Sequence, residues 1–528
     1  MTFSNRYKSE IANENWDAII IGSGISGLTT ARLLADSGKR VLILEKHFKF
    51  GGYTHTFKRN NYEWDVGIHY IGGNLHNPNS FLRRLFDYLS NNNLHWSRMD
   101  NIYDQIVFPD KTYDFVTGKQ PFIEQMISYF PKEEKAIMKY IELVNKVFKS
   151  SLSYYSNKAL PGILGTLTYP YMSKPFLRFA KRSTKDVLLE IGCSTESIGV
   201  LTGQWGDYGL PPEQSSFGIQ AMIAHHYFEG GNYPVGGSGM IAETIIPGIQ
   251  SQGGKAVLSC GVKELLINNG SAIGVLLDNG DEIRSKMVIS SVGVKNTFEV
   301  LVKNEDKTIN KSVPINQVEA SSGYYCLHIG LNKSAREINL KNANLWVYPG
   351  YDHDRNLENY LSDNKQPYPV VFISFPSAKD PSWDKDHPNS ATIEVITVAE
   401  FDKHKKWEDK QWKKRGDEYE SFKESISQSL LESLYKHSPN SKGYVDYYEL
   451  STPLTSRDLA NYKEGELYGI NHTPKRFQQR WLRPQTKVKN LYLTGQDIVT
   501  AGVSAAMMSG VITSSAILKK NMMKQFLH

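Results

Sequence analysis

The sequence of 528 residues contains few cysteines. Cys193, Cys260 and Cys326 lie far apart in the chain, without a CxxC pair or a Cys/His cluster. Regularly spaced cysteines would indicate a disulfide framework, and paired Cys and His ligands would indicate a zinc site. We therefore expect three buried thiols, no disulfide framework and no bound metal.

Long apolar segments are also missing. No stretch reaches about 18 consecutive apolar residues, so no membrane-spanning helix is expected, and residues 1–15 are too polar for a secretory signal. A cytoplasmic, reducing compartment is the resulting expectation. The net charge of +6 is mild and no nucleic-acid-binding module is recognisable, so we expect no nucleic-acid partner. The hydrophobic content of 40% is ordinary for a globular protein of roughly two to four domains.

A glycine-rich turn stands out within residues 16–52. An apolar segment that predicts a buried strand leads into Gly22-Ser23-Gly24-Ile25-Ser26-Gly27. In a dinucleotide-binding unit, Gly22 allows the tight turn and Gly24 lets the backbone approach a diphosphate. Gly27 lets the following helix pack closely on the strand. The turn therefore predicts a dinucleotide site near the N-terminus.

The elements that follow the turn complete this unit. Ile25 and Ser26, the first residues of the predicted helix, present free N–H groups and the positive end of the helix dipole to an anion. A second apolar strand at residues 41–44 ends in Glu45. A carboxylate at this spacing, roughly 20 residues on, accepts hydrogen bonds from a ribose. An isolated GxGxxG motif is weak evidence, but the whole unit is strong evidence.

Two segments favour FAD over NAD. Lys46 and the pair Gly51-Gly52 resemble an extension of flavoproteins of the glutathione-reductase type, in which a basic side chain and two glycines wrap the diphosphate. Near the C-terminus, a strand ends in Gly495-Gln496-Asp497, and a helix of small residues follows around Val503. In such flavoproteins the last strand and helix close over the ribityl chain and the flavin ring. The alternative for Asp497 is a helix N-cap.

Insertions interrupt the dinucleotide-binding pattern twice. We predict a discontinuous FAD-binding domain of residues 15–80, 232–300 and 480–520. Residues 81–231 and 301–479 lack the β-α-β rhythm and predict a substrate domain that associates with membranes. The fold class is therefore α/β, a glutathione-reductase-type Rossmann domain with an inserted α+β substrate domain. No second GxGxxG motif occurs, so the electron donor stays open.

These motifs together carry a family resemblance. The opening fingerprint, the glycine turn at residues 233–239 and the C-terminal Gly-Gln-Asp resemble phytoene desaturases, carotenoid isomerases and retinol saturases over residues 15–520. Several blocks are closest to the retinol saturases: His55-Thr56-Phe57, Asp65-Val66-Gly67-Ile68-His69-Tyr70, Gly206-Asp207-Tyr208-Gly209, Phe375-Pro376-Ser377-Ala378-Lys379-Asp380-Pro381 and Ser451-Thr452-Pro453-Leu454-Thr455. The resemblance implies bound FAD and adds Val262 to the cofactor-binding residues.

The resemblance also implies an activity. An FAD-dependent oxidoreductase of this kind acts on CH–CH groups and saturates a carbon–carbon double bond of a lipophilic polyene, such as a retinoid, a carotenoid or a related isoprenoid. The alternatives are a carotenoid desaturase and a carotenoid cis-trans isomerase. Because the hydride geometry is shared by both directions, the sequence leaves the direction open, and the mass of the product decides it.

Saturation needs a hydride from the flavin and a proton for the neighbouring carbon. His69 and Tyr70 follow the Asp-Val-Gly turn that resembles a flavin-approaching loop, and His226 precedes the second glycine turn. Histidine titrates near neutral pH, so His69 is the first candidate for the catalytic proton donor, before His226 and Tyr70. The alternative for each is a structural residue that packs on the flavin or a turn.

Residues 143–185 contain no acidic residue. Eight Lys and Arg side chains alternate there with Tyr, Phe, Leu and Ile, a composition that suits an anionic membrane surface. We expect peripheral membrane contact through this stretch, and the alternative is a basic surface over a core helix. Pro161, Pro170 and Pro175 are expected to break any long amphipathic helix.

Overall fold

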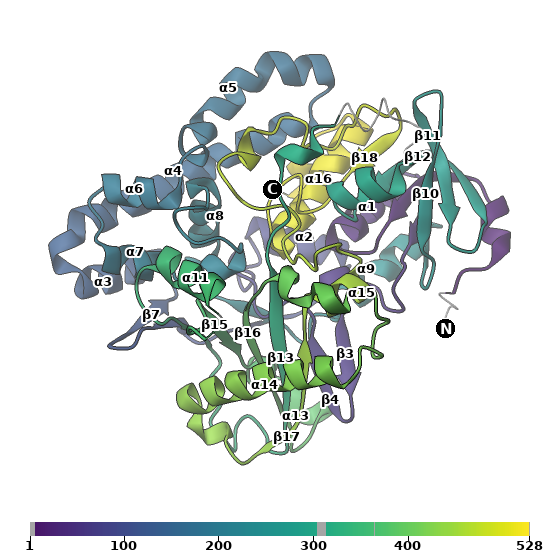
Figure 1. The fold of residues 1–528 in the computed structure, drawn as a ribbon. Coiled ribbons are helices and arrows are strands. Elements are labelled where there is room, and N and C mark those ends of the chain that lie inside the picture. The colour runs from purple at the N-terminus through teal and green to yellow at the C-terminus, as the bar shows by residue number, and fades with distance from the viewer. Residues whose placement is uncertain (1–5, 304–312, 364, 527–528) are drawn as a thin grey trace.

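The computed structural model describes residues 6–303, 313–363 and 365–526. Two seven-stranded sheets form its framework, and helices cover both (Figure 1). Within the predicted segment 301–479, residues 304–312 and 364 lie outside the described residues. Parallel strands joined to helices in the first sheet confirm the predicted α/β class.

Strands from distant parts of the chain share the first sheet. Its order is β10-β11-β12-β1-β2-β9, and β18 also pairs with β12. The neighbours β12, β1, β2 and β9 run parallel, as does β18 beside β12. The strands are β1 (Trp16–Ile21), β2 (Val41–Leu44), β9 (Lys255–Val257), β10 (Val262–Asn268), β11 (Ser271–Leu277), β12 (Glu282–Ser290) and β18 (Leu491–Leu493).

Strands β1 and β2 are apolar on both faces. Ile20 lies in the core with residues of helices α1 (Ile25–Asp36) and α9 (Met240–Ser251), while its neighbour Ile19 lies in the core on the other face. Parallel strands that are covered on both sides read as continuous hydrophobic runs, which explains the β-branched segments of the sequence. Each fully buried Ile or Leu contributes about 1.5–3 kcal/mol.

Helix α16 (Val503–Leu518) lies against α1, although the two stand near opposite ends of the chain (Figure 1). A Cβ on Gly510 of α16 would lie 2.7 Å from Cβ of Thr29 on α1. The small residues of α16 therefore allow a close helix contact. The contact between α16 and α1 places the C-terminal segment beside the glycine-rich turn.

The second sheet is largely antiparallel. Its order is β17-β13-β16-β15-β14-β6-β7, with one parallel pair, β14 and β6. The strands are β6 (Ile102–Val107), β7 (Thr112–Val116), β13 (Gly323–Leu331), β14 (Asn344–Val347), β15 (Val371–Ser374), β16 (Ala391–Ala399) and β17 (Val445–Ser451).

Alternation along the strands gives this sheet two unlike faces. Odd-numbered residues of β13 and β16, such as Leu327 and Val395, pack with helix α14 (Asp417–His437). Even-numbered residues, such as His328 and Glu394, point to the opposite face because successive side chains alternate. That opposite face lies toward the first predicted insertion, residues 81–231.

The remaining elements connect or cover these sheets. Two small antiparallel pairs are β3 (Thr56–Arg59) with β4 (Tyr62–Asp65), and β5 (Trp96–Arg98) with β8 (Asn232–Pro234). The helices are α2 (Phe81–Leu89), α3 (Lys119–Tyr129), α4 (Glu134–Ala159), α5 (Gly162–Ala180), α6 (Thr184–Glu190), α7 (Thr195–Leu201), α8 (Phe217–Tyr227), α11 (His353–Ser362), α12 (Pro376–Lys379), α13 (Trp383–Asp386) and α15 (Pro453–Ala460).

Helix α5 corrects one expectation from the sequence. Pro161 separates it from α4, as expected, but Pro170 and Pro175 lie inside α5. Both of these prolines are on the exposed side of the helix. On an exposed side, a carbonyl group that loses its N–H partner to a proline is accessible to water, so the cost of the proline is smaller than in a buried helix. The expectation that prolines break this helix is therefore wrong.

Candidate functional site

The glycine-rich turn has the geometry that a diphosphate needs. Gly22 has a φ of +93°, which favours glycine. A Cβ on Gly27 would lie 2.4 Å from the carbonyl oxygen of Gly22, so helix α1 packs too closely for a side chain there. A Cβ on Gly24 would meet no heavy atom of the described residues within 4 Å. Open space therefore lies beside Gly24, where the sequence predicts the diphosphate.

The N-terminus of α1 supplies positive potential beside this turn. Gly24 is its N-cap, and its first turn, Ile25-Ser26-Gly27, contains no acidic side chain that would repel an anion. N–H groups in the first turn of a helix have no intrahelical acceptor, and the helix dipole favours negative charge there. These groups fit a diphosphate.

Glu45 is fixed beside the turn by three hydrogen bonds. Its Oε2 accepts from the N–H of Ser23 at 2.9 Å and from the hydroxyl of Ser23 at 2.6 Å. Its Oε1 accepts from the N–H of His47 at 2.8 Å. The carboxylate thus stands directly after β2, the position predicted for a ribose-binding acid.

The pair Gly51-Gly52 lies beside the glycine-rich turn of residues 22–27. Gly51 forms an isolated parallel bridge with Gly24, and its N–H donates to the Ser23 hydroxyl at 3.0 Å. A Cβ on Gly52 would lie 3.2 Å from Cα of Gly24. Lys46 points elsewhere, because its Nζ donates to Oδ1 of Asn461 at 3.1 Å.

Val262 and Gly495 reach the same neighbourhood from later parts of the chain. Val262 begins β10, two residues after Cys260, whose N–H donates to the carbonyl oxygen of Glu45 at 2.8 Å. Gly495 has a φ of +119°, and a Cβ there would lie 3.7 Å from Oγ of Ser26. The structure therefore gathers these predicted residues around the start of α1.

Asp497 joins two backbone segments. Its Oδ2 accepts from the N–H of Val294 at 2.8 Å, and its Oδ1 accepts from the N–H of Ile470 at 3.1 Å. Gly502 is the N-cap of α16, and Val503 is its first residue, so the N-cap alternative for Asp497 is wrong.

A cavity of about 630 Å³ begins at the start of α16. Val503 and Ser504 line it. Residues of α4, of α8 and of the second sheet, on the face that carries Glu394, also line it. Its apolar lining includes Ile68, Ile223, Trp346, Phe372, Ile396 and Met508. Leu152 of α4 also lines it and is 47% exposed, so the cavity reaches the surface there. The volume is within the range of about 300–1,000 Å³ for small-molecule sites.

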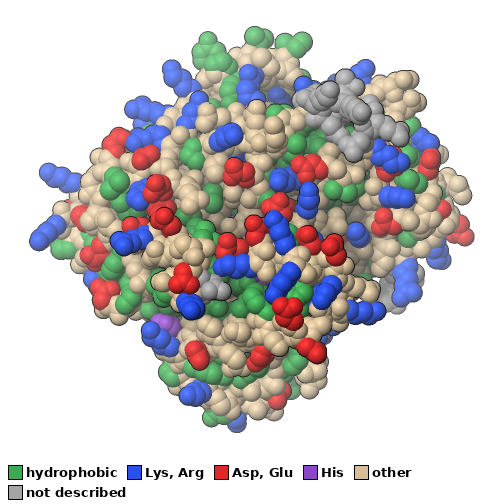
Figure 2. Space-filling view, viewed as in Figure 1, with side chains coloured by type: hydrophobic (Ala, Val, Ile, Leu, Met, Phe, Trp, Pro, Cys, Tyr) green, Lys and Arg blue, Asp and Glu red, His purple; other side chains and the backbone are tan. Residues whose placement is uncertain are grey.

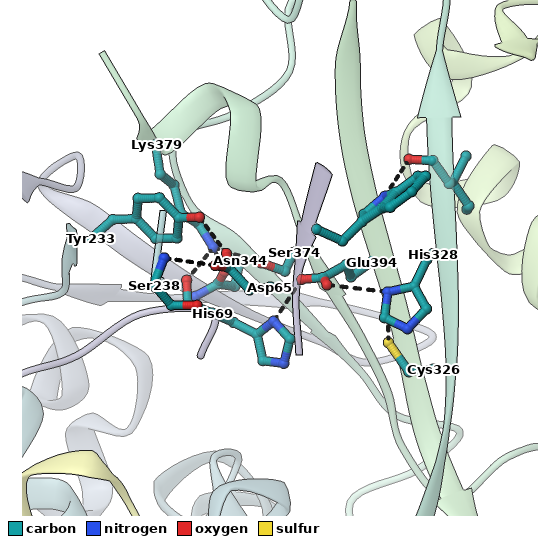
Figure 3. Close-up of polar contacts among 12 residues, drawn as sticks. Asp65, His69, Tyr233, Ser238, Cys326, His328, Asn344, Ser374, Lys379 and Glu394 are labelled. Carbon is teal, nitrogen blue, oxygen red and sulfur yellow. Dashed lines mark hydrogen bonds and ion pairs between the residues drawn. The ribbon is translucent and has the colours of Figure 1, made fainter. Parts of the chain in front are cut away.

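His69 lies at a polar edge of this apolar cavity. Its Nδ1 is 2.7 Å from Oε2 of Glu394, a fully buried residue of β16 (Figure 3). Its carbonyl oxygen accepts a hydrogen bond from Nζ of the buried Lys379 at 2.9 Å. The loop after β4 is therefore held against the second sheet at both the ring and the backbone of His69.

Tyr70 belongs to a different buried network. Its hydroxyl oxygen is 2.9 Å from Oδ2 of Asp104 and 3.1 Å from Oδ2 of Asp207. Burial raises the pKa of Asp104 to about 6, and burial together with the charge of Asp104 raises the pKa of Asp207 to about 8. Burial raises the pKa of Tyr70 well above its usual value, so the phenol keeps its proton.

His226 has a backbone partner. Its Nε2 accepts a hydrogen bond from the N–H of Gly72 at 3.0 Å, and burial lowers its pKa to about 4. A neutral His226 therefore holds the loop that follows Tyr70. All three catalytic candidates line the cavity, but His69 alone among these three contacts a carboxylate while also lying partly exposed.

The sequence analysis missed Glu394 and Lys379. Glu394 is the single acid within the apolar run 391–399, and a lone charge in a buried strand pattern is a signal for a function or a buried partner. Lys379 lies in a block that carried the family resemblance, without an assigned role. The register that places Glu394 in the second sheet does not follow from the local sequence pattern. The contacts of Glu394 and Lys379 with His69 do not follow from it either.

The expectation about the cysteines is wrong at one position. Cys193 and Cys260 are buried, but Cys326 is partly exposed and lies beside a histidine, its Sγ 3.7 Å from Nδ1 of His328. Cys326, His328 and Glu394 place one potential metal-ligand atom each within 4.8 Å of one another. The strand pairing of β13 with β16 creates this cluster.

The basic, aromatic stretch 143–185 divides between core and surface. Half of its large apolar side chains are buried, among them Tyr154, Phe176 and Phe179. The outer side of α5 exposes Ile163, Leu164, Leu167 and Tyr171, and Figure 2 shows green side chains beside blue ones at the top edge, over α5. Lys158 is held inside by a 2.7 Å hydrogen bond to the carbonyl oxygen of Ile498.

Across residues 6–303, 313–363 and 365–526, the helices are too short or too polar for any of them to cross a membrane.

The chain is similar to a family model and to several known proteins. Residues 20–89 match the family model described as NAD(P)-binding Rossmann-like domain. All-trans-retinol 13,14-reductase from Danio rerio is 34% identical over 560 residues, which cover 99% of this chain and 90% of that protein. A second Danio rerio protein, named inactive all-trans-retinol 13,14-reductase, is 30% identical and covers 97% of this chain and 87% of its own length. Prolycopene isomerase 1 from an Oncidium hybrid cultivar is 28% identical and covers 96% and 84%.

Solved structures share the fold. A putrescine oxidase variant superposes with a TM-score of 0.61 at 15% identity, over 96% of this chain and 99% of that chain. Cyclohexylamine oxidase from Brevibacterium oxydans superposes with a TM-score of 0.60 at 15% identity, over 98% and 100%. At these identities the likeness shows a common architecture of two sheets and their helices.

Proposed function

The chain belongs to the all-trans-retinol 13,14-reductase family, and from this premise we propose that it is an FAD-dependent oxidoreductase that saturates a carbon–carbon double bond of a lipophilic polyene. The relative named as a reductase is 34% identical over nearly the whole chain, against 28% for the prolycopene isomerase. Because another relative is named inactive, similarity alone does not establish activity, and the site itself has to support it.

The observation that carries the proposal is the apolar cavity that begins at α16 and ends at His69. Its lining of aliphatic and aromatic side chains suits a polyene, since burial of apolar surface from water is favourable. Its opening at Leu152 gives a long hydrophobic molecule a route inward. A polar substrate would leave its hydrogen-bonding groups unsatisfied along most of this lining.

The residues gathered around α1 fit FAD as the cofactor. Gly24 and the first turn of α1 would hold the diphosphate, Glu45 the ribose, and the segment from Gly495 to Val503 the flavin end. Bound FAD would supply the hydride for the double bond. The protein then has to orient the polyene, exclude water and deliver a proton to the neighbouring carbon.

We assign the delivery of that proton to Nε2 of His69. Histidine exchanges protons near neutral pH, and the ring lines the cavity. Tyr70 instead keeps its proton within the aspartate network, and His226 uses Nε2 to accept the N–H of Gly72. Both therefore serve better as positioning groups for the cavity wall.

We also propose that the outer side of α5 rests on an anionic membrane surface. Its exposed Ile163, Leu167 and Tyr171 are followed on the same helix by Lys174 and Arg178. Apolar side chains enter the headgroup boundary while basic side chains stay at its rim. Since α4 packs on α5 and carries the cavity opening, a membrane-dissolved polyene would have a short path to the cavity.

The test is anaerobic incubation of the chemically reduced holoenzyme with all-trans-retinol or a carotenoid, followed by mass spectrometry. A product heavier by two hydrogens supports the saturase. The oxidised holoenzyme is incubated in parallel: a product lighter by two hydrogens identifies a desaturase, and an isomer of unchanged mass identifies an isomerase. A Gly24→Val protein, which should lack flavin, controls for non-enzymatic reduction.

A further inference from the structure

Glu394 is a fully buried acid beside the cavity, with no side-chain exposure. It stands on β16 directly opposite His328 of β13 and points to the face of the sheet that carries Ile396 and Phe372 of the cavity wall. Figure 3 shows it between two histidines, His69 on one side and His328 on the other. The carboxylate thus links the cavity edge to the interior of the second sheet.

The two contacts of Glu394 differ in quality. Its Oε2 is 2.7 Å from Nδ1 of His69, the length of a charge-assisted hydrogen bond. Its Oε1 is 3.3 Å from Nδ1 of His328, an ion-pair distance without hydrogen-bond geometry. His328 has other partners, with Nδ1 at 3.7 Å from Sγ of Cys326 and Nε2 at 3.2 Å from Oγ of Ser451. His69 is therefore the principal partner of the carboxylate.

A buried carboxylate needs a positive partner, because an unpaired charge inside a protein is costly. Burial alone would raise the pKa of Glu394, but the charge and hydrogen bond of His69, together with the nearby His328, outweigh it and lower the pKa to about 2. Glu394 is thus ionised throughout the physiological range. The carboxylate accepts from Nδ1 of His69 and so fixes which ring nitrogen faces the sheet.

The neighbouring charged groups leave this pair intact. Nζ of Lys379 donates to neutral acceptors, which are the carbonyl oxygen of His69, Oδ1 of Asn344 and Oγ of Ser374. Burial lowers the pKa of Lys379 to about 7, against the opposing pull of Asp104, Glu394 and Asp65.

Asp65, on the strand β4 that leads to His69, is also engaged elsewhere. It accepts from the N–H of Ser238 at 2.8 Å and from the hydroxyl of Tyr233. Burial and the charge of Glu394 raise its pKa to about 6. Lys379 therefore anchors the backbone of His69, while Glu394 alone among these groups bonds its ring.

We propose that Glu394 is a positioning residue that orients the ring of His69, binding Nδ1 so that Nε2, on the other side of the ring, is the nitrogen that delivers the proton. This inference rests on the proposed function and deepens it. In the step, the Nε2–H bond of His69 breaks and a C–H bond forms at the carbon next to the one that receives the hydride. His69 becomes neutral, Glu394 stays ionised, and solvent returns the proton before the next turnover.

The test follows the ring of His69 by NMR in histidine-labelled protein without substrate, with His69→Gln used to assign the signal. In Glu394→Gln the amide cannot hold a cation, so the titration midpoint of the His69 ring should fall by at least about one pH unit, a tenfold change in the protonated-to-neutral ratio. Glu394→Asp keeps the charge and should recover most of the shift. Glu449→Gln, which removes a carboxylate from neighbouring β17, is the matched control and should leave the midpoint in place.

Turnover gives a second, separate readout. With Glu394→Gln, kcat should fall at pH 7 and recover toward lower pH, while KM and flavin content change little, because the variant alters proton delivery and not binding. A structural role alone would lower activity equally at every pH. If no variant reduces a polyene, the proposed function fails, yet the NMR midpoint still decides the link between Glu394 and His69.

Three results would overturn the inference. One is an unchanged His69 midpoint in Glu394→Gln. Another, which needs only the wild-type protein and therefore holds if Glu394→Gln does not fold, is a nitrogen-15 spectrum in which Nδ1 of His69 shows no hydrogen bond to a carboxylate. The third is stoichiometric zinc in the purified protein that is lost in both Glu394→Gln and Cys326→Ser, since Cys326, His328 and Glu394 would then be a metal site.

Discussion

The two sheets differ in what they place on their faces. In the first, β1 and β2 carry apolar residues on both sides, so the polar groups beside Gly24 come from the glycine-rich turn, the start of α1 and the flanking loops. In the second, β13 and β16 are largely apolar toward α14, and the other face combines apolar residues such as Ile396 with His328 and Glu394.

This difference separates two ways of building a site. Backbone groups of a tight turn recognise a feature common to all dinucleotides, so the first sheet needs only glycine and a helix end. Side chains fixed in a low-dielectric interior can instead tune protonation, so the second sheet suits the chemical step. Substitutions in the first region should therefore change cofactor content, and those in the second should change rate and pH response.

The largest effect is expected at Gly24. In Gly24→Val the new side chain meets open space in the protein, so the chain should fold, but it would occupy the place of the diphosphate. The purified variant should lack flavin absorbance at a melting temperature close to that of the flavin-free wild type. Gly27→Ala is the contrast, because its Cβ would lie 2.4 Å from a carbonyl oxygen and should cost about 1–3 kcal/mol of unfolding free energy. Flavin retained by Gly24→Val would contradict the assignment.

The next effect is expected at His69. His69→Gln keeps hydrogen-bonding capacity but loses a group that gives up a proton near neutral pH. The rate of polyene reduction should fall by roughly 10²–10⁴-fold, the usual contribution of a general acid, with flavin content unchanged. His226→Leu is the comparison, and it should mainly lower the unfolding free energy, by about 1–3 kcal/mol, because the N–H of Gly72 loses its acceptor. Equal loss of rate in both variants would refute this division of roles.

A smaller effect concerns stability against pH. The folded-state pKa of Asp207, about 8, lies above its usual value near 3.8, so the fold disfavours its ionised form. Its contribution to stability is complete below about pH 4 and is lost as the pH rises through 8, by at most about 1.4 kcal/mol per pH unit. Asp207→Asn should remove this loss, so thermal melts of the two proteins should converge at low pH and diverge at high pH. The exposed Asp386→Asn should follow the wild type; if it behaves as Asp207→Asn does, the buried network is not the cause.

The smallest effect is expected on the surface of α5. Replacing Lys174, Arg178 and Lys181 by Glu should weaken sedimentation with anionic liposomes by about 1 kcal/mol per basic residue, and added salt should shrink the difference. The matched control replaces three exposed lysines elsewhere, Lys132, Lys385 and Lys442. Flavin content should stay constant in both triple variants. Identical binding of the two would mean that α5 is an ordinary solvated surface.

The nucleotide-binding unit could be predicted from the sequence because it is local. The roles of Gly22, Gly24 and Gly27 depend on a turn and a helix that follow one another in the chain, and the fold bears out their geometry. The Asn-Gly turn at residues 268–270 was predictable for the same reason, with positive φ at Asn269 and Gly270. In a second Asn-Gly pair, Asn279-Gly280, only the glycine has a positive φ, so the pair does not form a type I′ turn.

By itself the sequence determined the glycine-rich turn and the α/β class, since both depend on contiguous residues and their periodicity, and it indicated the family through its resemblance to known motifs. Only the tertiary structure decided which groups meet at the chemical end of the site. His69, Lys379 and Glu394 come from a loop, a short helix and a strand, and their meeting depends on the register of β13 with β16 and on the loop docking against that sheet. A charge in a strand has no partner in its own neighbourhood of the chain, so packing alone tells whether it is paired, and with what.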